Sequence, residues 1–225
     1  MLCFGMPALI ELDTVEETVS LCAELGLDFV ELNTNFPLQQ IHKMDPALLN
    51  RLAEQYGIGY TIHLNDDLPV ADFNPGVAKA YCQSVLDAIA FAKKIGCKVL
   101  NLHIAEGAHY TTPARIVYFY EAYKEEYLQG MAAFRDACEA AVGSSGIRIC
   151  MENSKAYFGF QKEALDLLLE SPVFFILLGA WVEDSAPTFG QDQTVSLEKA
   201  RCVRDTGQGL SLWEAELEIT YWEDV

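Results

Sequence analysis

The sequence predicts an α/β fold, a parallel (β/α) barrel of the TIM type, in a single domain over residues 1–225. The chain of 225 residues is long enough for one such barrel. Short β-rich runs alternate with amphipathic stretches, which is typical of βαβ units and a parallel sheet. Neither a GxGxxG turn nor a GxxxxGK[ST] loop occurs. A barrel is therefore favoured over a dinucleotide-binding sheet.

The first unit consists of a capped helix and a strand. Thr14 and Glu17 have the spacing of a capping box, and the apolar residues after them recur with a helical period. Gly26 suits the left-handed position that follows a helix. The run 27–32 has the composition of a buried strand. An earlier strand is expected near residues 3–9.

Four further units repeat this order of helix and strand. Helices are expected at about residues 46–56, 75–95, 113–142 and 161–170. The strands after them are expected near residues 59–65, 98–104, 147–153 and 173–180. A seventh strand near residues 201–205 has the weakest pattern, and there is no room for an eighth unit. The barrel is therefore predicted to be incomplete at its C-terminal end, with six to seven recognisable strands.

Charge and cysteine content narrow the range of functions. The formal net charge is −18, whereas nucleic-acid binding needs a basic surface to replace counterions, so a nucleic-acid partner is disfavoured. The seven cysteines are scattered without a CxxC pair, and the start lacks a signal-peptide pattern. Both features predict a reducing, cytoplasmic location. The apolar runs are shorter than the ~20 residues of a membrane helix, so no membrane partner is expected.

Polar side chains end most of the predicted strands. In a parallel barrel these ends converge on the active face. They are, in chain order, Glu31, Asn33, His63, Asn65, His103, Glu106, Glu152 and Asn153. Imidazole and carboxylate together suit a divalent ion such as Zn²⁺, Mn²⁺ or Mg²⁺. Each residue alone could equally be a hydrogen-bonded core residue, but two histidines on successive strands, with Glu-Asn on the next, favour a functional site.

Several segments resemble one known family in their order and spacing. The start, CFGMPALIELDTVEETVSLCAELGLDFVELN, resembles the first β-α-β unit of the xylose isomerase-like TIM barrels. GYTIHLN, KVLNLHIAEG and IRICMENS resemble the third, fourth and fifth strands of that superfamily. The similarity covers roughly residues 1–172, and the superfamily includes sugar-phosphate isomerases and epimerases as well as the endonuclease IV proteins. The resemblance implies one or more divalent metals at the strand ends.

The resemblance also implies roles for single residues. Glu152 matches the fifth-strand metal ligand, which in the isomerases can also act as an acid/base. His63 and His103 match histidines that bind metal in the endonuclease branch and more often contact substrate in the isomerase branch. We therefore expect these three residues to be catalytic and to bind a Mn, Zn or Mg ion. The residues expected to bind substrate are Glu31, Asn33, Asn65, Glu106, Asn153 and Phe36. Phe36 would line the apolar face of a sugar, although it could equally be a packing residue.

The C-terminal third departs from the family pattern. The sixth strand of the family usually ends in Asp-x-x-His, whereas a gapless match places Gly179 and Val182 at those positions. Glu183 and Asp184 lie close by but out of register. The seventh strand usually reads His-x-His-Asp, and residues 202–205 here read CVRD. The last strand of the family, with its closing glutamate ligand, has no counterpart.

Three functions stay open on the sequence. The first is a sugar or sugar-phosphate isomerase or epimerase that moves a proton next to a carbonyl with the help of a divalent metal. The second is a sugar-binding barrel that has lost the metal site. The third is an endonuclease IV-like nuclease, against which the charge of −18 counts. A small carbohydrate is the expected partner. A homo-oligomer stays open because an incomplete barrel exposes sheet edges.

Overall fold

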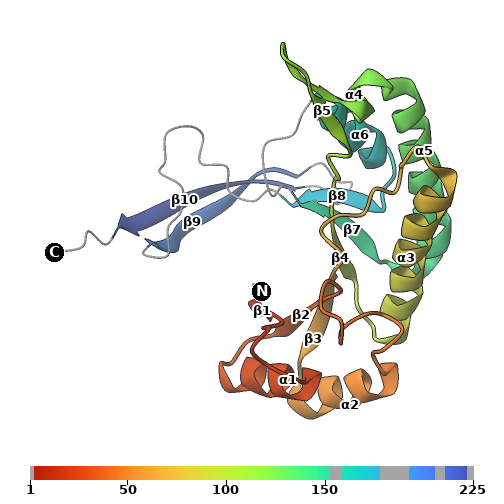
Figure 1. Ribbon diagram of the computed structural model, residues 1–225. Helices are drawn as coiled ribbons and strands as arrows, with labels where there is room; N and C mark the ends of the chain where they lie inside the picture. The colour runs from red at the N-terminus through yellow and green to blue at the C-terminus, as the bar shows by residue number, and fades with distance from the viewer. Residues whose placement is uncertain (1–2, 153–158, 178–192, 206–210, 222–225) are drawn as a thin grey trace. The chain divides into compact units, whose positions relative to one another are not determined.

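The computed structural model describes residues 3–152, 159–177, 193–205 and 211–221. The chain divides into two compact units, Met1–Leu177 and Leu178–Val225. The first unit contains a six-stranded sheet with its helices, and the second contains two antiparallel strands (Figure 1). Among the described residues, no helix is long and apolar enough to cross a membrane.

The sheet of the first unit is parallel, as the sequence predicts. Its strands follow one another in chain order and are β1 (Gly5–Pro7), β2 (Phe29–Asn33), β3 (Gly59–His63), β4 (Val99–His103), β7 (Arg148–Glu152) and β8 (Phe174–Leu177). Every neighbouring pair is parallel. The register aligns Asn33 with His63, and His103 with Glu152. The predicted strand-end residues therefore meet at one edge of the sheet.

Helices lie between the strands, and the first three of them each begin after a residue whose side chain caps the helix. They are α1 (Val15–Glu24), α2 (Pro46–Tyr56), α3 (Pro75–Lys94), α4 (Phe119–Ala122), α5 (Lys124–Val142) and α6 (Gly159–Leu169), with a 3-10 turn at Gly143–Ser145. Thr14 and Glu17 form both bonds of the predicted capping box. Asp45 and Asn74 each accept a bond from a backbone N–H at the start of the helix that follows. Gly57 ends α2 at φ 69°, where a side chain would be strained.

The core lies between the sheet and these helices, which flank its outer side (Figure 1). Buried residues alternate along β2 and β3, whereas the middle three residues of β4 and of β7 are all buried. Leu32, Ile62 and Leu100 are fully buried. The polar strand-end groups stand beyond this packed layer. The fold thus gives the site a rigid floor of apolar residues.

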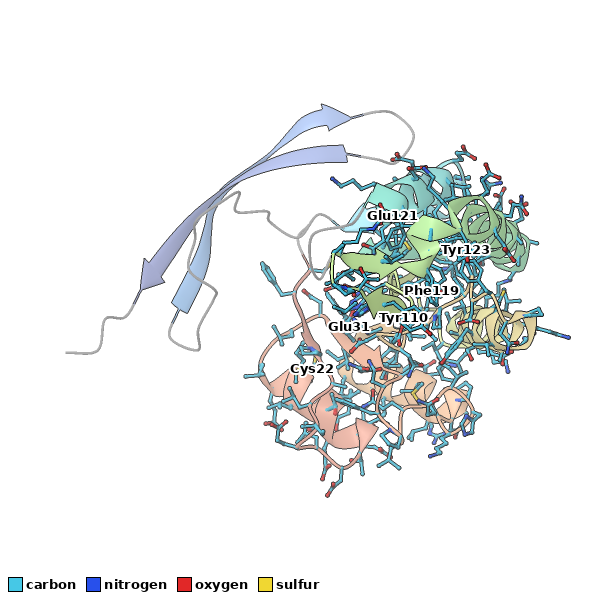
Figure 2. The ribbon with its side chains drawn as sticks, turned by 45° about the horizontal axis from the view of Figure 1, so that its top comes forward. Cys22, Glu31, Tyr110, Phe119, Glu121 and Tyr123 are labelled. Carbon is cyan, nitrogen blue, oxygen red and sulfur yellow. The ribbon has the colours of Figure 1, made fainter. Side chains whose placement is uncertain are left out.

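The segment before α5 corrects one expectation. A helix was expected from about residue 113, but the chain first forms an antiparallel hairpin of β5 (His109–Thr111) and β6 (Ile116–Tyr118). Thr112 and Arg115 close its turn with backbone and side-chain bonds. β-Branched and aromatic residues favour the strand after the turn. The Tyr110 ring packs on Phe119, with ring centroids 5.0 Å apart (Figure 2).

The second unit also differs from the expected pattern. A parallel strand was expected near residues 201–205, but these residues end β9 (Gln193–Asp205), which pairs antiparallel with β10 (Ser211–Tyr221). The sequence AELEITY within β10 alternates apolar and polar residues, which is the period of an antiparallel strand with two different faces. The strand forecast at 173–180 is described only as far as Leu177.

Candidate functional site

Three strand-end residues of the first unit converge on one point. His63 and His103 end β3 and β4, and Glu152 ends β7. The Nε2 atom of each histidine lies 3.6 Å from the same Oε2 atom of Glu152. The two imidazole rings meet edge to face, with centroids 5.0 Å apart. The histidine side chains are only 13% and 17% exposed, so water screens this cluster poorly.

The hydrogen bonds of the histidines indicate where their lone pairs point. Nδ1 of His63 lies 2.7 Å from the carbonyl oxygen of Leu64, and only a protonated Nδ1 can donate to a carbonyl. The lone pair of the neutral ring is therefore on Nε2, which faces Glu152. Nε2 of His103 is buried and has no hydrogen-bond partner among the described residues. An unsatisfied buried polar atom costs about 1–3 kcal/mol.

This donor set fits a divalent metal ion. Two imidazole nitrogens and one carboxylate oxygen are a common ligand set for a catalytic zinc with one open position. Ligand atoms with ~2.0 Å bonds to a tetrahedral ion lie about 3.3 Å apart. The observed N–O separations of 3.6 Å need little adjustment to reach that distance. An ion would also give His103 Nε2 the partner that it lacks among the described residues.

A fourth group, Asp66, lies at the other edge of the His63 ring. Its Oδ1 atom is 3.7 Å from Nδ1 of His63, and its side chain is 65% exposed. Ligand atoms of His63, Asp66 and His103 all lie within 4.8 Å of one another. Because Nδ1 already donates to Leu64, the Nε2 side with Glu152 is the better ion position.

Glu31 of β2, labelled in Figure 2, interacts electrostatically with His63 and Glu152. Burial raises the pKa of its carboxyl group above the ordinary value; the charge of His63 opposes this rise and that of Glu152 adds to it. Nδ2 of Asn101 donates a hydrogen bond to Oε1 of Glu31. Asn101 is buried on β4 and was missed in the sequence. Its signal was a polar residue in the middle of the apolar run KVLNLHI.

The other predicted substrate-binding residues lie in different surroundings. Oδ1 of Asn33 accepts a bond from the backbone N–H of Asn35, and the Asn65 amide bonds to Thr34. Phe36 lines an apolar cavity of about 410 Å³ between the loops that follow β1 and β2. Glu106 is half-buried after β4. The remaining positions, Asn153, Gly179, Val182, Glu183 and Asp184, lie outside the described residues.

Comparison with known proteins agrees with the fold. The profile of the xylose isomerase-like TIM barrel family matches residues 19–178. The chain belongs to this family. The predicted α/β barrel class is thereby confirmed, although residues 201–205 do not add a parallel strand. No curated protein matches the chain.

Solved structures of this barrel type are similar to the chain. A D-tagatose 3-epimerase-like protein superposes with a TM-score of 0.60 at 20% identity, covering 78% of this chain and 64% of that chain. A D-allulose 3-epimerase from Methylomonas sp. gives 0.57 at 19%, covering 78% and 62%. The IOLI protein with a binding zinc atom gives 0.59 at 11%, also covering 78% and 62%. The chain thus spans less than two thirds of each of these proteins, and the likeness shows the fold.

Proposed function

We propose that this protein is a sugar or sugar-phosphate isomerase or epimerase that uses a divalent metal ion. The convergence of two histidine Nε2 atoms on one Glu152 oxygen carries the proposal, together with the buried His103 Nε2, which has no hydrogen-bond partner in the described part of the chain. The family membership supports the reaction class. The epimerase neighbours support a small carbohydrate substrate, and the zinc atom bound in the IOLI structure supports a bound metal ion.

The roles of the residues follow from their positions. His63, His103 and Glu152 would hold the ion, which supplies polarisation of a substrate carbonyl and stabilises the negative charge of an enediolate. Glu152 would act as the base that removes the proton from the carbon next to that carbonyl, and in an isomerisation its carboxyl group would return that proton to the former carbonyl carbon. Glu31, held by Asn101, binds a substrate hydroxyl within the same electrostatic environment. The apolar floor beneath the site limits the access of water to the reactive intermediate.

The first experiment measures metal by elemental analysis in the full-length protein, before and after incubation with Mn²⁺, Zn²⁺ or Mg²⁺. Glu152→Gln is compared with Asp205→Asn, which removes a carboxylate in the second unit. We expect about one ion per chain in the wild type and in Asp205→Asn, and none in Glu152→Gln. Ketose isomerisation or epimerisation should need the ion. A wild type that never takes up metal would rule out this mechanism.

A second candidate function is sugar binding without turnover. The departures of the C-terminal third from the family pattern favour it, because the usual sixth- and seventh-strand ligands have no counterpart in register. Calorimetric titration with ketoses in the presence of a chelator distinguishes the two candidates. Binding without metal dependence or product would favour this candidate. The nuclease alternative, disfavoured by the net charge of −18, predicts cleavage of abasic-site DNA.

A further inference from the structure

We propose that Asp66 is a positioning residue for His63. The Asp66 carboxylate holds the imidazole ring of His63 with Nε2 directed at Glu152. The inference rests on the proposed function, since it concerns how one ligand of the ion is oriented. The effect of Asp66 would act through the opposite edge of the His63 ring.

The two edges of the His63 ring face different groups. Nδ1 faces the Leu64 carbonyl at 2.7 Å and Oδ1 of Asp66 at 3.7 Å. Nε2 faces Oε2 of Glu152 at 3.6 Å. A negative charge next to Nδ1 stabilises the proton there and leaves the lone pair on Nε2. Metal-binding histidines generally donate their other N–H to a carboxylate or a carbonyl, which orients the ring and makes it a stronger donor. Leu64 and Asp66 provide one group of each kind.

Asp66 is held in place although its side chain is 65% exposed. Nδ2 of Asn35 donates to Oδ1 of Asp66 at 3.0 Å, and the backbone N–H of Asp66 donates to Oδ1 of Asn35 at 3.2 Å. Asn35 is itself fixed, because its backbone N–H donates to Asn33 at 2.9 Å. A freely moving surface carboxylate would contribute little to His63. The reciprocal bonds with Asn35 prevent that movement.

A second set of bonds fixes the backbone of His63. Its carbonyl accepts bonds from the backbone N–H of Thr34 at 2.9 Å and from the Thr34 hydroxyl at 3.2 Å. The Asn65 amide bonds to both the hydroxyl and the carbonyl of Thr34. The loops after β2 and β3 are therefore joined by side chains where the strand ladder ends. Asn65 takes part in this connection, and the substrate-binding role expected of Asn33 and Asn65 stays a prediction.

The test uses the full chain without metal and with ¹⁵N-labelled histidine. Two-bond proton–nitrogen correlation spectra report the ring tautomer, and His63→Gln assigns the His63 signals among the four histidines. Asp66→Asn is compared with Asp67→Asn, the same substitution at the next exposed residue. We expect the wild type and Asp67→Asn to show a proton on Nδ1 of His63. Asp66→Asn should show a larger fraction with the proton on Nε2.

Zinc affinity, measured by competition with a chelator, gives the second readout. We expect Asp66→Asn to bind zinc about 10-fold more weakly than Asp67→Asn. Unchanged His63 signals in Asp66→Asn would overturn the proposal. If zinc affinity fell while the His63 signals stayed unchanged, Asp66 would be a direct ligand of the ion rather than a positioning residue. A wild type that binds no zinc, but whose tautomer responds to Asp66→Asn, would reject the metal-dependent function and leave the positioning role intact.

Discussion

The two units of the chain are built on opposite principles. In Met1–Leu177, the six strands of the main sheet all pair in parallel, helices connect most of them, and polar residues collect at one edge of the sheet. In Leu178–Val225, the described residues form two antiparallel strands of 13 and 11 residues. The carboxyl ends of parallel strands all lie at one edge of the sheet, whereas those of antiparallel strands lie at opposite edges in turn. The described site residues accordingly all belong to the first unit.

The largest effect is expected from a cavity in the core of the first unit. Leu100 on β4 is fully buried, so Leu100→Ala should lower the free energy of unfolding by about 2–5 kcal/mol. The described helices all belong to the first unit, whereas the three tryptophans, at 181, 213 and 222, belong to the second. Urea unfolding followed by helical circular dichroism and by tryptophan fluorescence therefore reports on the two units separately.

The dichroism and fluorescence signals show whether the two units also differ in how they unfold. If the units unfold independently, Leu100→Ala shifts only the dichroism transition, and the matched variant Leu25→Ala, at a residue that is 60% exposed, shifts neither. Equal shifts of both signals would mean that the chain unfolds as one cooperative unit. The distinction between two units would then not extend to stability.

The fold of the first unit could be predicted because its signals are local. Thr14 and Asp45 cap helices within the next few residues, and a strand such as GYTIH is a short run in which buried apolar residues alternate with less buried ones. The hairpin before α5 was missed because Pro113 suits both the first turn of a helix and a β-turn. The antiparallel pairing of β9 was missed because pairing depends on a partner strand rather than on the strand itself.

The site was predictable only where topology alone decides proximity. His63, His103 and Glu152 end neighbouring parallel strands, so the fold is sufficient to bring them together. The bond between Asn101 and Glu31 runs between strands 70 residues apart in sequence. The bonds of Asn35 with Asp66 depend on side-chain conformations in two loops. Neither leaves a pattern in the order of residues.

A smaller effect on the free energy of unfolding is expected at the N-cap of α1. It tests whether residues close in sequence determine where this helix begins. Thr14→Ala removes the side-chain oxygen that accepts a bond from the backbone N–H of Glu17, and should cost about 1 kcal/mol. The dichroism transition in urea gives the measurement, with Ser20→Ala, later in the same helix, as control. A loss as small as in the control would mean that tertiary packing alone defines the start of α1.

The smallest expected effect is a change in the pH dependence of the free energy of unfolding when Glu31, a residue of the candidate site in the first unit, is replaced. Because burial raises the pKa of this carboxyl in the folded protein, its ionisation opposes folding. The contribution of Glu31 to stability is therefore greatest below its unfolded pKa and is lost as pH rises through the folded pKa. Glu31→Gln keeps an oxygen that can accept the bond from Asn101 but cannot ionise.

We therefore expect the wild type to gain stability relative to Glu31→Gln as pH falls from neutral into the range between the two pKa values. The comparison requires urea unfolding at several pH values with a chelator present, because a bound cation would favour the ionised carboxyl. Glu54→Gln, on the exposed side of α2, is the control and should show no such trend. A difference that is constant with pH would mean that Glu31 titrates alike in both states. Ionisation of Glu31 would then not lower the free energy of unfolding of the first unit.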